Sequence, residues 1–364
     1  MPRCSKSHPS RRALRLTRLE NRITPALATP TTAVGAGAGA LPVVNVYDRD
    51  GGLMRSFLAY DSSFRGGVRV AVADVTGDGI WDVITAPGPG GGPHVKVFDG
   101  VTGALVRQWM AYDPAFRGGV FVAAAPIDLN DNFAEIVTGA GAGGGPHVQV
   151  FDGKTGEVVT SFMAYDPAFT GGVDVAAIRT HTVVDPDPRR PSSTYPGQVM
   201  TGAGPGGGPH VRFFDGTTGQ MQGEFFAWPH NPHGLGYVAG YSGGVNVAAD
   251  FESAGGTGSL HIVTGAGPGV QPEVQVFSGG TLLTRFLAYS ADFRGGVTVD
   301  VLPDLTFSGM GPSIITGTGP GGGPDVRQLR IPPDLGYNDA DAPAALDREF
   351  FAFDPAFRGG VFVG

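Results

Sequence analysis

The chain has very little cysteine and no long apolar run. Its only cysteine, Cys4, excludes an intramolecular disulfide and a cysteine-based zinc site. No segment approaches the roughly eighteen consecutive apolar residues that a membrane-spanning helix needs. The motifs of common catalytic and nucleotide sites are also missing in complete form. There is no H-E-x-x-H sequence and no G-x-x-x-x-G-K-[ST] phosphate loop, and the isolated matches Gly153-Lys154-Thr155 (GKT) and Gly240–Gly244 (G-x-S-x-G) lie in glycine-rich turns with no helix expected after them. These absences favour a protein that is not an enzyme.

Glycine and proline, in contrast, are abundant. The 364 residues include 61 glycines and 30 prolines, a quarter of the chain, where about an eighth is usual. This share excludes a helical bundle. A disordered chain is excluded as well, because 41% of the residues are hydrophobic and 23 are phenylalanine. We therefore expect the glycines to lie in recurring turns of an ordered fold.

The charge is unevenly distributed. Residues 1–25 carry seven basic side chains and one acidic, so the rest of the chain has a net charge of −14 against −8 overall. An acidic body argues against nucleic acid or anionic lipid as the main partner. We expect residues 1–30 to form a basic leader or disordered tail outside the fold.

Within this tail, Leu19-Glu20-Asn21-Arg22 with Pro25 resembles the Leu-Glu-x-Arg-x-x-Pro leader of many planctomycete surface and exported proteins. The resemblance implies a secreted or cell-surface protein and removal of the tail. The alternative is a solvated basic arm that stays on the chain.

Six internal repeats fill the chain from about residue 32 to residue 364. The run from Thr85 (TAPGPGGGPHVKVFDG) returns from Thr138 as TGAGAGGGPHVQVFDG. Such self-similarity at a fixed period is the signature of a repeat architecture. Copies begin near Thr32, Thr85, Thr138, Thr201, Thr264 and Thr316.

Each repeat is expected to form four short antiparallel strands, here called A to D. In the second repeat, strand C covers 95–98, strand D covers 106–112, and the next strand A covers 120–124, with Gly- and Pro-rich turns between them. Four such strands in about 50 residues are typical of a β-propeller blade. The chain starts in a strand B and stops inside a strand A. We therefore predict an all-β, six-bladed propeller, closed when strand A at Gly360–Val363 joins the N-terminal strands B, C and D.

The blade sequence resembles the FG-GAP repeat of the integrin α-subunit propeller and of many bacterial surface proteins. Phe64-Arg65-Gly66-Gly67 stands where the family has Phe-Gly, and Thr85-Ala86-Pro87 where it has Gly-Ala-Pro. The long Gly-Pro-Gly-Gly-Gly-Pro-His-Val stretch departs from the family, which makes this a glycine-rich variant. The resemblance covers about residues 32–364.

The loop between strands A and B of the second blade resembles the family's Asp-x-Asp-x-Asp-Gly-x-x-Asp calcium loop, with a threonine in place of one carboxylate. Calcium takes six to eight oxygen ligands, and the loop would offer oxygens from Asp74, Thr76, Asp78, Ile80 and Asp82. The alternative is a turn rich in Asp and Gly that binds nothing. The matching loop from Asp128 to Glu135 is degraded, and whether it binds calcium stays open.

Other recurring residues are expected to be structural. His94, His147 and His210 begin strand C in different blades, too far apart to converge on one ion, so each should hydrogen-bond within its turn or to a neighbouring blade. Large aromatic residues recur on and after strand D and should pack between blades: Phe57, Trp109, Phe162, Phe225, Phe286 and Phe350, with Tyr60, Tyr112, Tyr165, Trp228, Tyr289 and Phe353.

Places where the period breaks are candidates for function. The expanded connection from blade four to blade five is one, because its rings and imidazoles could stack on a sugar or a peptide aromatic; the alternative is a loop that packs on the rim. Its candidate ligand-binding residues are Trp228, His230, His233, Tyr237 and Tyr241. A second insertion, Pro332–Asp347, is acidic and is expected to be a solvated loop.

Three functions remain open at this stage. The first is an exported, calcium-stabilised, non-catalytic module, expected to be a monomer, that binds a protein or glycan ligand on a propeller face in adhesion. The second is a lectin-like binder that uses the loop from Trp228 to Tyr241. The third is a polysaccharide hydrolase or lyase, which would need paired carboxylates close to the central opening, and the sequence shows no such pair.

Overall fold

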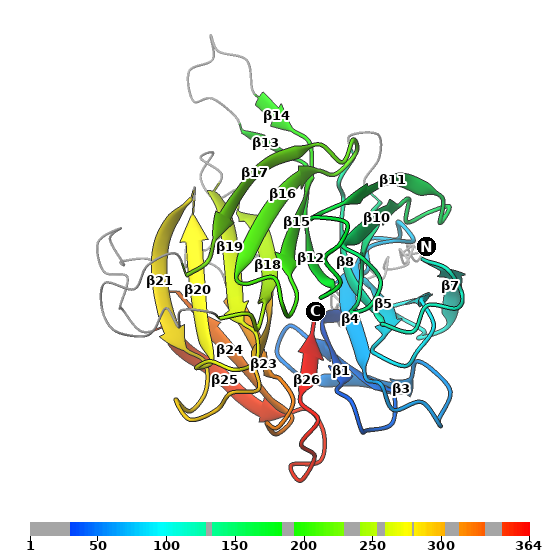
Figure 1. Ribbon diagram of the computed structural model, residues 1–364. Coiled ribbons are helices and arrows are strands. Elements are labelled where there is room, and N and C mark those ends of the chain that lie inside the picture. The colour runs from blue at the N-terminus through cyan, green and yellow to red at the C-terminus, as the bar shows by residue number, and fades with distance from the viewer. Residues whose placement is uncertain are drawn as a thin grey trace, which may run out of the picture.

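The computed structural model describes residues 30–128, 133–183, 193–228, 241–252, 259–278, 280–302, 313–331 and 344–364. These residues form six four-stranded antiparallel sheets around a common axis, which confirms the predicted six-bladed propeller (Figure 1). The predicted leader, apart from Pro30, lies outside the described residues. No described segment forms a helix that is long and apolar enough to cross a membrane.

The blades repeat the same strand order from the axis outward. The second blade is β4 (Val68–Ala73), β5 (Asp82–Pro87), β6 (His94–Phe98) and β7 (Leu105–Met110), and the third is β8 (Val120–Ala125), β9 (Glu135–Ala140), β10 (His147–Phe151) and β11 (Val158–Met163). The fourth blade is β12 (Val173–Ile178), β15 (Gln198–Ala203), β16 (His210–Asp215) and β17 (Met221–Phe226). The fifth is β18 (Val245–Glu252), β19 (Ser259–Ala266), β20 (Glu273–Ser278) and β21 (Thr281–Leu287), and the sixth is β22 (Val297–Leu302), β23 (Ser313–Thr318), β24 (Asp325–Arg330) and β25 (Ala345–Phe351). A two-stranded ribbon, β13 (His181–Val183) with β14 (Ser193–Tyr195), leaves the fourth blade between strands A and B.

The first blade is assembled from both ends of the described chain, as predicted. Strand β26 (Val361–Val363) pairs with β1 (Pro30–Ala36), which is followed outward by β2 (Val43–Asp48) and β3 (Leu53–Leu58). Ala33 and Gly364 exchange two backbone hydrogen bonds at 2.7 and 3.1 Å. This pairing gives β1 a partner on both sides and closes the ring.

The strand register places the start of the first repeat two residues later than the sequence pattern does. Val34 pairs with Val363 and Asn45, as Thr138 pairs with Val122 and Gln149. The residue equivalent to the repeat threonine is therefore Val34, two residues after Thr32. Because the first repeat has a valine where the other repeats have a threonine, the sequence pattern alone does not align it correctly.

Aromatic side chains of strand D pack against strand C of the next blade, which confirms that these rings are core. Ring centroids lie 4.7 Å apart for Phe57 and Phe98 and 5.3 Å apart for Trp109 and Phe151. The same contact recurs at 4.5 Å for Phe162 and Phe214 and at 5.0 Å for Phe225 and Phe277. Pairs of this kind contribute about 0.5–1.5 kcal/mol beyond the area they bury.

The tyrosine that follows strand D adds hydrogen bonds between blades. Tyr112 donates its hydroxyl to the carbonyl of His147 at 3.0 Å and lies 3.1 Å from Thr138 Oγ1, both in the next blade. Tyr60, Tyr165 and Tyr289 repeat this arrangement. Each junction of this kind is therefore held by packing and by a buried polar link.

Two junctions depart from the tyrosine link. Between blades six and one, the tyrosine–threonine pair is replaced by Phe353 and Val34, which belong to one apolar cluster. Between blades four and five, Trp228 donates instead to Glu273 Oε1 at 3.1 Å, and Thr264 Oγ1 is buried without a hydrogen-bond partner. At the junction between blades six and one both partners are apolar, whereas at the junction between blades four and five the threonine hydroxyl is left without a partner.

Two of the recurring histidines bond within their own blade, so the predicted hydrogen bond within the glycine-rich turn or to a neighbouring blade is wrong for them. His147 Nε2 lies 2.7 Å from Ser161 Oγ, and His210 Nε2 lies 3.0 Å from Glu224 Oε2. Both partners are on strand D of the same sheet rather than in the glycine-rich turn. Burial lowers the pKa of both imidazoles.

Candidate functional site

Asp82, the last residue of the predicted calcium loop, is a buried acceptor of backbone hydrogen bonds. Its side chain begins β5 and accepts N–H groups from Val75 at 3.0 Å, Thr76 at 2.9 Å and Gly100 at 3.1 Å. Its carboxylate thus joins the A–B loop to the turn between strands C and D. Burial raises the pKa of Asp82, while these three N–H groups act in the opposite direction.

The other carboxylates of this loop also bond to its backbone. Asp74 accepts the N–H groups of Gly77 at 2.6 Å and Gly79 at 2.9 Å, and Asp78 accepts that of Ile80 at 2.8 Å. No group of three His, Cys, Asp or Glu side chains in the described part of the chain is placed to hold a metal ion. These hydrogen bonds do not exclude calcium, because an ionised carboxylate has about four lone-pair sites and can accept an N–H while it binds a cation. Calcium at this loop stays a prediction.

Glu135 has the role of Asp82 in the third blade. Its Oε2 accepts the N–H of Ile127 at 2.5 Å and that of Asp128 at 3.3 Å. Burial, together with the nearby charge of Asp128, raises the pKa of Glu135 to about 7. The carboxylate predicted to end each loop is thus an internal acceptor in both blades. Residues 129–132 of the degraded loop lie outside the described residues.

The proposed stacking loop is described only at its two ends. Trp228 and Tyr241 pack edge to face with ring centroids 6.2 Å apart. Their polar atoms are engaged within the protein, by Glu273 in one case and by the carbonyl of Gly244 at 2.6 Å in the other. His230, His233 and Tyr237 lie outside the described residues, so the predicted platform stays a prediction. The acidic insertion is described only at its end, where Asp347 pairs with Arg330 at 2.9 Å.

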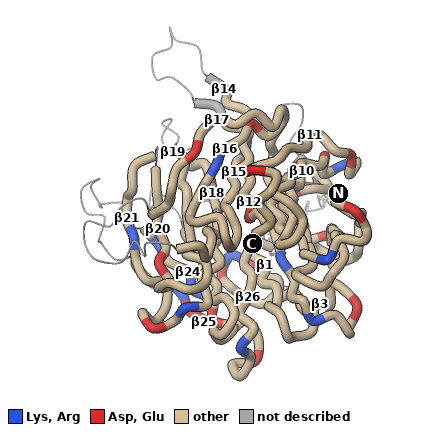
Figure 2. The backbone as a smooth tube through the Cα atoms, in the orientation of Figure 1, with Lys and Arg blue, Asp and Glu red and all other residues tan. Residues whose placement is uncertain are grey.

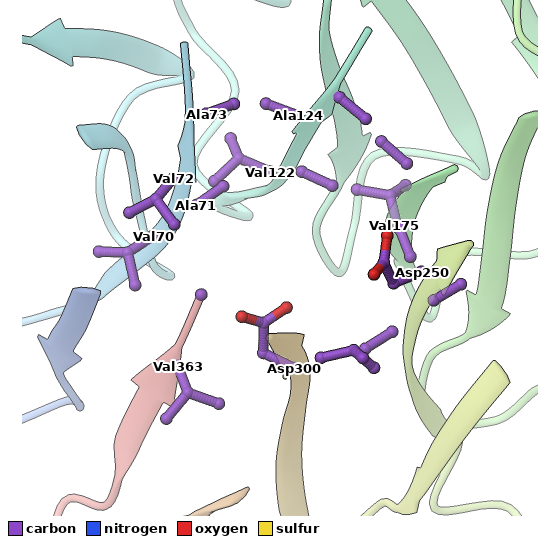
Figure 3. A pocket seen from close by; sticks show the side chains of 18 of the residues that line it. Val70, Ala71, Val72, Ala73, Val122, Ala124, Val175, Asp250, Asp300 and Val363 are labelled. Carbon is purple, nitrogen blue, oxygen red and sulfur yellow. The ribbon is translucent and has the colours of Figure 1, made fainter. Parts of the chain in front are cut away.

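A cavity of about 360 Å³ occupies the axis of the propeller. Its walls are the innermost strands β4, β8, β12, β18, β22 and β26, and most of the side chains that it exposes are alanine and valine (Figure 3). Its size falls within the range of about 300–1,000 Å³ that is usual for small-molecule sites. Charged residues of both signs are interspersed around the ring (Figure 2).

One level of the channel forms a belt that links neighbouring blades. The register places one residue of each innermost strand at this level: Arg69, Phe121, Asp174, Asn246, Thr298 and Phe362. Their polar groups contact the backbone of the next innermost strand. Arg69 donates to the carbonyl of Val120 at 3.1 Å, and Asp174 accepts the N–H of Val247 at 2.9 Å. Asn246 and Thr298 donate to the next strand in the same way.

The two phenylalanines of this belt complete the environment of Arg69. Its guanidinium lies 3.6 Å from the ring centroid of Phe121 and 5.4 Å from that of Phe362. Burial lowers the pKa of Arg69 to about 10 and raises that of Asp174 to about 6, while the opposite charges of the two groups limit both shifts. Arg69 and Asp174 therefore link neighbouring blades of the ring.

Asp300 and Asp250 are different, because neither belongs to the belt. Figure 3 shows the Asp300 carboxylate standing in the open centre of the channel, with Asp250 on the neighbouring strand. Asp300 has only the N–H of Val301 as a hydrogen-bond donor among the described residues. Asp250 has an ion partner in Arg179 at 3.9 Å. Burial raises the pKa of both carboxyls, and the charge of Asp250 raises that of Asp300 further, to about 7.

The sequence analysis missed these carboxylates, although a signal was present. The four residues that share the register of Asp300 in blades two to five are all alanine: Ala71, Ala123, Ala176 and Ala248. Asp250 in turn stands where the second and third blades have Ala73 and Ala125. The breaks in the period that the sequence makes obvious are insertions, whereas Asp250 and Asp300 are single substitutions on innermost strands.

Comparisons with known proteins add no family. No family model and no curated protein matches the chain. Among solved structures, it is similar to the Dos1 propeller, with 14% identity, a TM-score of 0.41, and coverage of 86% of this chain and 65% of that one. It is also similar to the C-terminal domain of PilY1 from Pseudomonas aeruginosa, with 12% identity, a TM-score of 0.44 and coverage of 84% and 79%. A third similar structure is BamB from Moraxella catarrhalis, with 12% identity, a TM-score of 0.38, and coverage of 91% of this chain and 90% of that one. Likeness at this level concerns the fold alone.

Proposed function

We propose that the protein is an exported, non-catalytic ligand-binding module, a glycine-rich propeller of the FG-GAP type that acts in adhesion or capture. The observation that carries this proposal is the Asp300 carboxylate, which faces a cavity at the axis and contributes no interblade bond. A buried charge without an ion partner lowers stability. Its presence at a position where the repeat otherwise has alanine is explained by an interaction with something that enters the channel.

Family type and export rest on the sequence. The Phe64–Gly67 turn and the Thr85–Pro87 strand support the FG-GAP resemblance, and the Leu19–Pro25 motif supports export. Calcium enters the proposal through this resemblance only. Sequencing of the N-terminus of the protein recovered outside the cell tests export and processing together, since an intact Met1 would contradict removal of the leader.

A binding screen on the purified protein tests the function. Protein, glycan and small-molecule ligands are screened by thermal shift and calorimetry, with and without calcium, against the wild type and the Asp300→Ala variant. We expect at least one class to bind the wild type and to lose affinity in the variant. Binding that is equal in both proteins would remove the channel from the proposal, and the absence of any ligand would contradict the binding function.

A polysaccharide hydrolase or lyase is the second candidate, and one observation favours it. That reaction needs paired carboxylates near the central opening, and Asp250 and Asp300 lie on adjacent innermost strands close enough for the charge of one to raise the pKa of the other. Incubation with a panel of acidic and neutral polysaccharides tests it. Release of reducing ends by the wild type but not by Asp300→Ala would establish the enzyme in place of the binding module.

A further inference from the structure

The charged side chains that line the channel differ in how far they are already neutralised. Those on or beside the innermost strands are Arg69, Asp74, Asp174, Arg179, Asp250 and Asp300. Arg69 and Asp174 are used by the belt, as described above. Asp74 bonds to its own loop, and Arg179 donates to the carbonyl of Phe251 at 2.7 Å while it lies beside Asp250. Asp300 has neither an ion partner nor a side-chain donor among the described residues, and the N–H of Val301 is the one hydrogen-bond donor given to it there.

Asp300 is also removed from the outer surface of the protein. It is partly exposed, and it lines the channel at the axis of the ring. In such a site a carboxylate loses much of its hydration, and an incoming cation with N–H donors would restore both its charge balance and its hydrogen bonds. Asp250 adds a second negative charge, close enough to raise the pKa of Asp300. Its own ion partner, Arg179, lies 3.9 Å away and is partly exposed.

We propose that the central channel binds a primary alkylammonium group, with the Asp300 carboxylate as its charge partner. This inference rests on the proposed binding function and names the chemistry of its ligand. The source of the group is either a free alkylamine or the lysine side chain of a protein ligand.

The channel walls select this class of cation. Alanine and valine side chains such as Ala71, Val122 and Val175 surround the carboxylates (Figure 3), so they contact an alkyl chain favourably and offer no ring of oxygens. Calcium takes six to eight oxygen ligands, and the described part of the chain brings no three metal-ligating side chains together. An ammonium needs fewer acceptors, because it carries three N–H donors on one tetrahedral nitrogen.

Proton release should accompany binding. The pKa of Asp300 is raised to about 7 in the free protein, so part of the population carries a proton near neutral pH. An ammonium beside this carboxylate favours its ionised form and lowers that pKa. Affinity should therefore rise with pH between about 6 and 8. Asp250, whose charge acts on Asp300, also has a raised pKa, so its ionisation adds to the rise of affinity with pH.

The test compares n-butylamine with its neutral and anionic counterparts, n-butanol and butyrate, on the full chain at pH 7.5. Thermal shift and calorimetry are run on the wild type, on Asp300→Ala, and on Asp113→Asn, which removes the same charge from an exposed turn. We expect a saturable rise in Tm with butylamine only, at least a tenfold loss of affinity in Asp300→Ala, and no change in Asp113→Asn. Calorimetry in two buffers of different ionisation enthalpy should show release of a fraction of a proton.

Equal binding of butylamine by the wild type and Asp300→Ala would overturn the inference, and so would an equal effect of butanol. An Nα-acetyl-lysine methylamide arm separates the sources: binding of this probe alone assigns the group to a protein ligand, and binding of butylamine alone assigns it to a free amine. If neither amine binds while the broader screen finds a glycan or peptide ligand, the ammonium site is wrong and the binding function stands.

Discussion

Replacing Asp300 by alanine should stabilise the protein, and the gain should grow with pH. The variant restores the residue that blades two to five have at this position. Because the pKa of Asp300 is higher in the folded state than in the unfolded chain, the folded state binds more protons. Stability from this group is therefore fully present below about pH 4 and is lost as the pH rises through the folded pKa of about 7.

The size of the effect follows from the two pKa values. A difference of about three units, at 1.36 kcal/mol each, corresponds to roughly 4 kcal/mol at alkaline pH. About 1.5 kcal/mol of this is already lost at pH 5. The free energy of unfolding of Asp300→Ala, relative to the wild type, should thus increase by at most about 3 kcal/mol between pH 5 and pH 8.

Urea titrations at fixed pH, followed by the fluorescence of the three tryptophans, measure this difference. Asp174→Ala is the matched control in the same channel. It should be less stable than the wild type, because it leaves the Val247 N–H without its acceptor and the buried Arg69 without its counter-charge. Parallel stability curves for the wild type and Asp300→Ala across this pH range would refute the reasoning.

Two further predictions concern hydrogen bonds of the scaffold. Tyr112→Phe should lower the free energy of unfolding by about 1–2 kcal/mol, because it removes the hydroxyl that bonds to Thr138 and His147. Adding Thr138→Val recreates the apolar pair of the Phe353–Val34 junction, so urea unfolding of the double variant should show that part of this loss is recovered. Strictly additive losses in the double variant would contradict the idea that the two residues act as a pair. Asp82→Ala should lower Tm in metal-free buffer because it leaves three backbone N–H groups without their acceptor. A loss of Tm that occurs only when calcium is present would instead identify Asp82 as a calcium ligand.

The fold followed from the sequence because its signals repeat. Six copies of the same turn and strand pattern fixed the number of blades, and the half-repeats at the two ends of the pattern required Val361–Val363 to join β1. The recurring aromatic residues could be assigned to the interblade core for the same reason. Only the start of the first repeat was displaced, because Val34 replaces the threonine that marks the other copies.

The candidate site could not be predicted in the same way. Asp250 and Asp300 are 50 positions apart in sequence, and only the strand register shows that they replace alanines on the channel wall. The contacts of Arg69 with Phe121 and Phe362 likewise form across the ring. Asp82 illustrates a further limit, since the same aspartate in a glycine-rich loop can coordinate an ion or accept backbone hydrogen bonds, and the residue type does not distinguish the two.

The central claim is that the channel holds a carboxylate that the fold does not neutralise. The most direct measurement is the pH titration of the Asp300 side-chain carboxyl by carbon-13 NMR in the ligand-free protein, with Asp300→Ala used to assign the signal. We expect an apparent pKa of about 7. A pKa close to the ordinary aspartate value of about 3.9 would contradict it, because the carboxylate would then be hydrated or paired and would have no need of a cationic ligand.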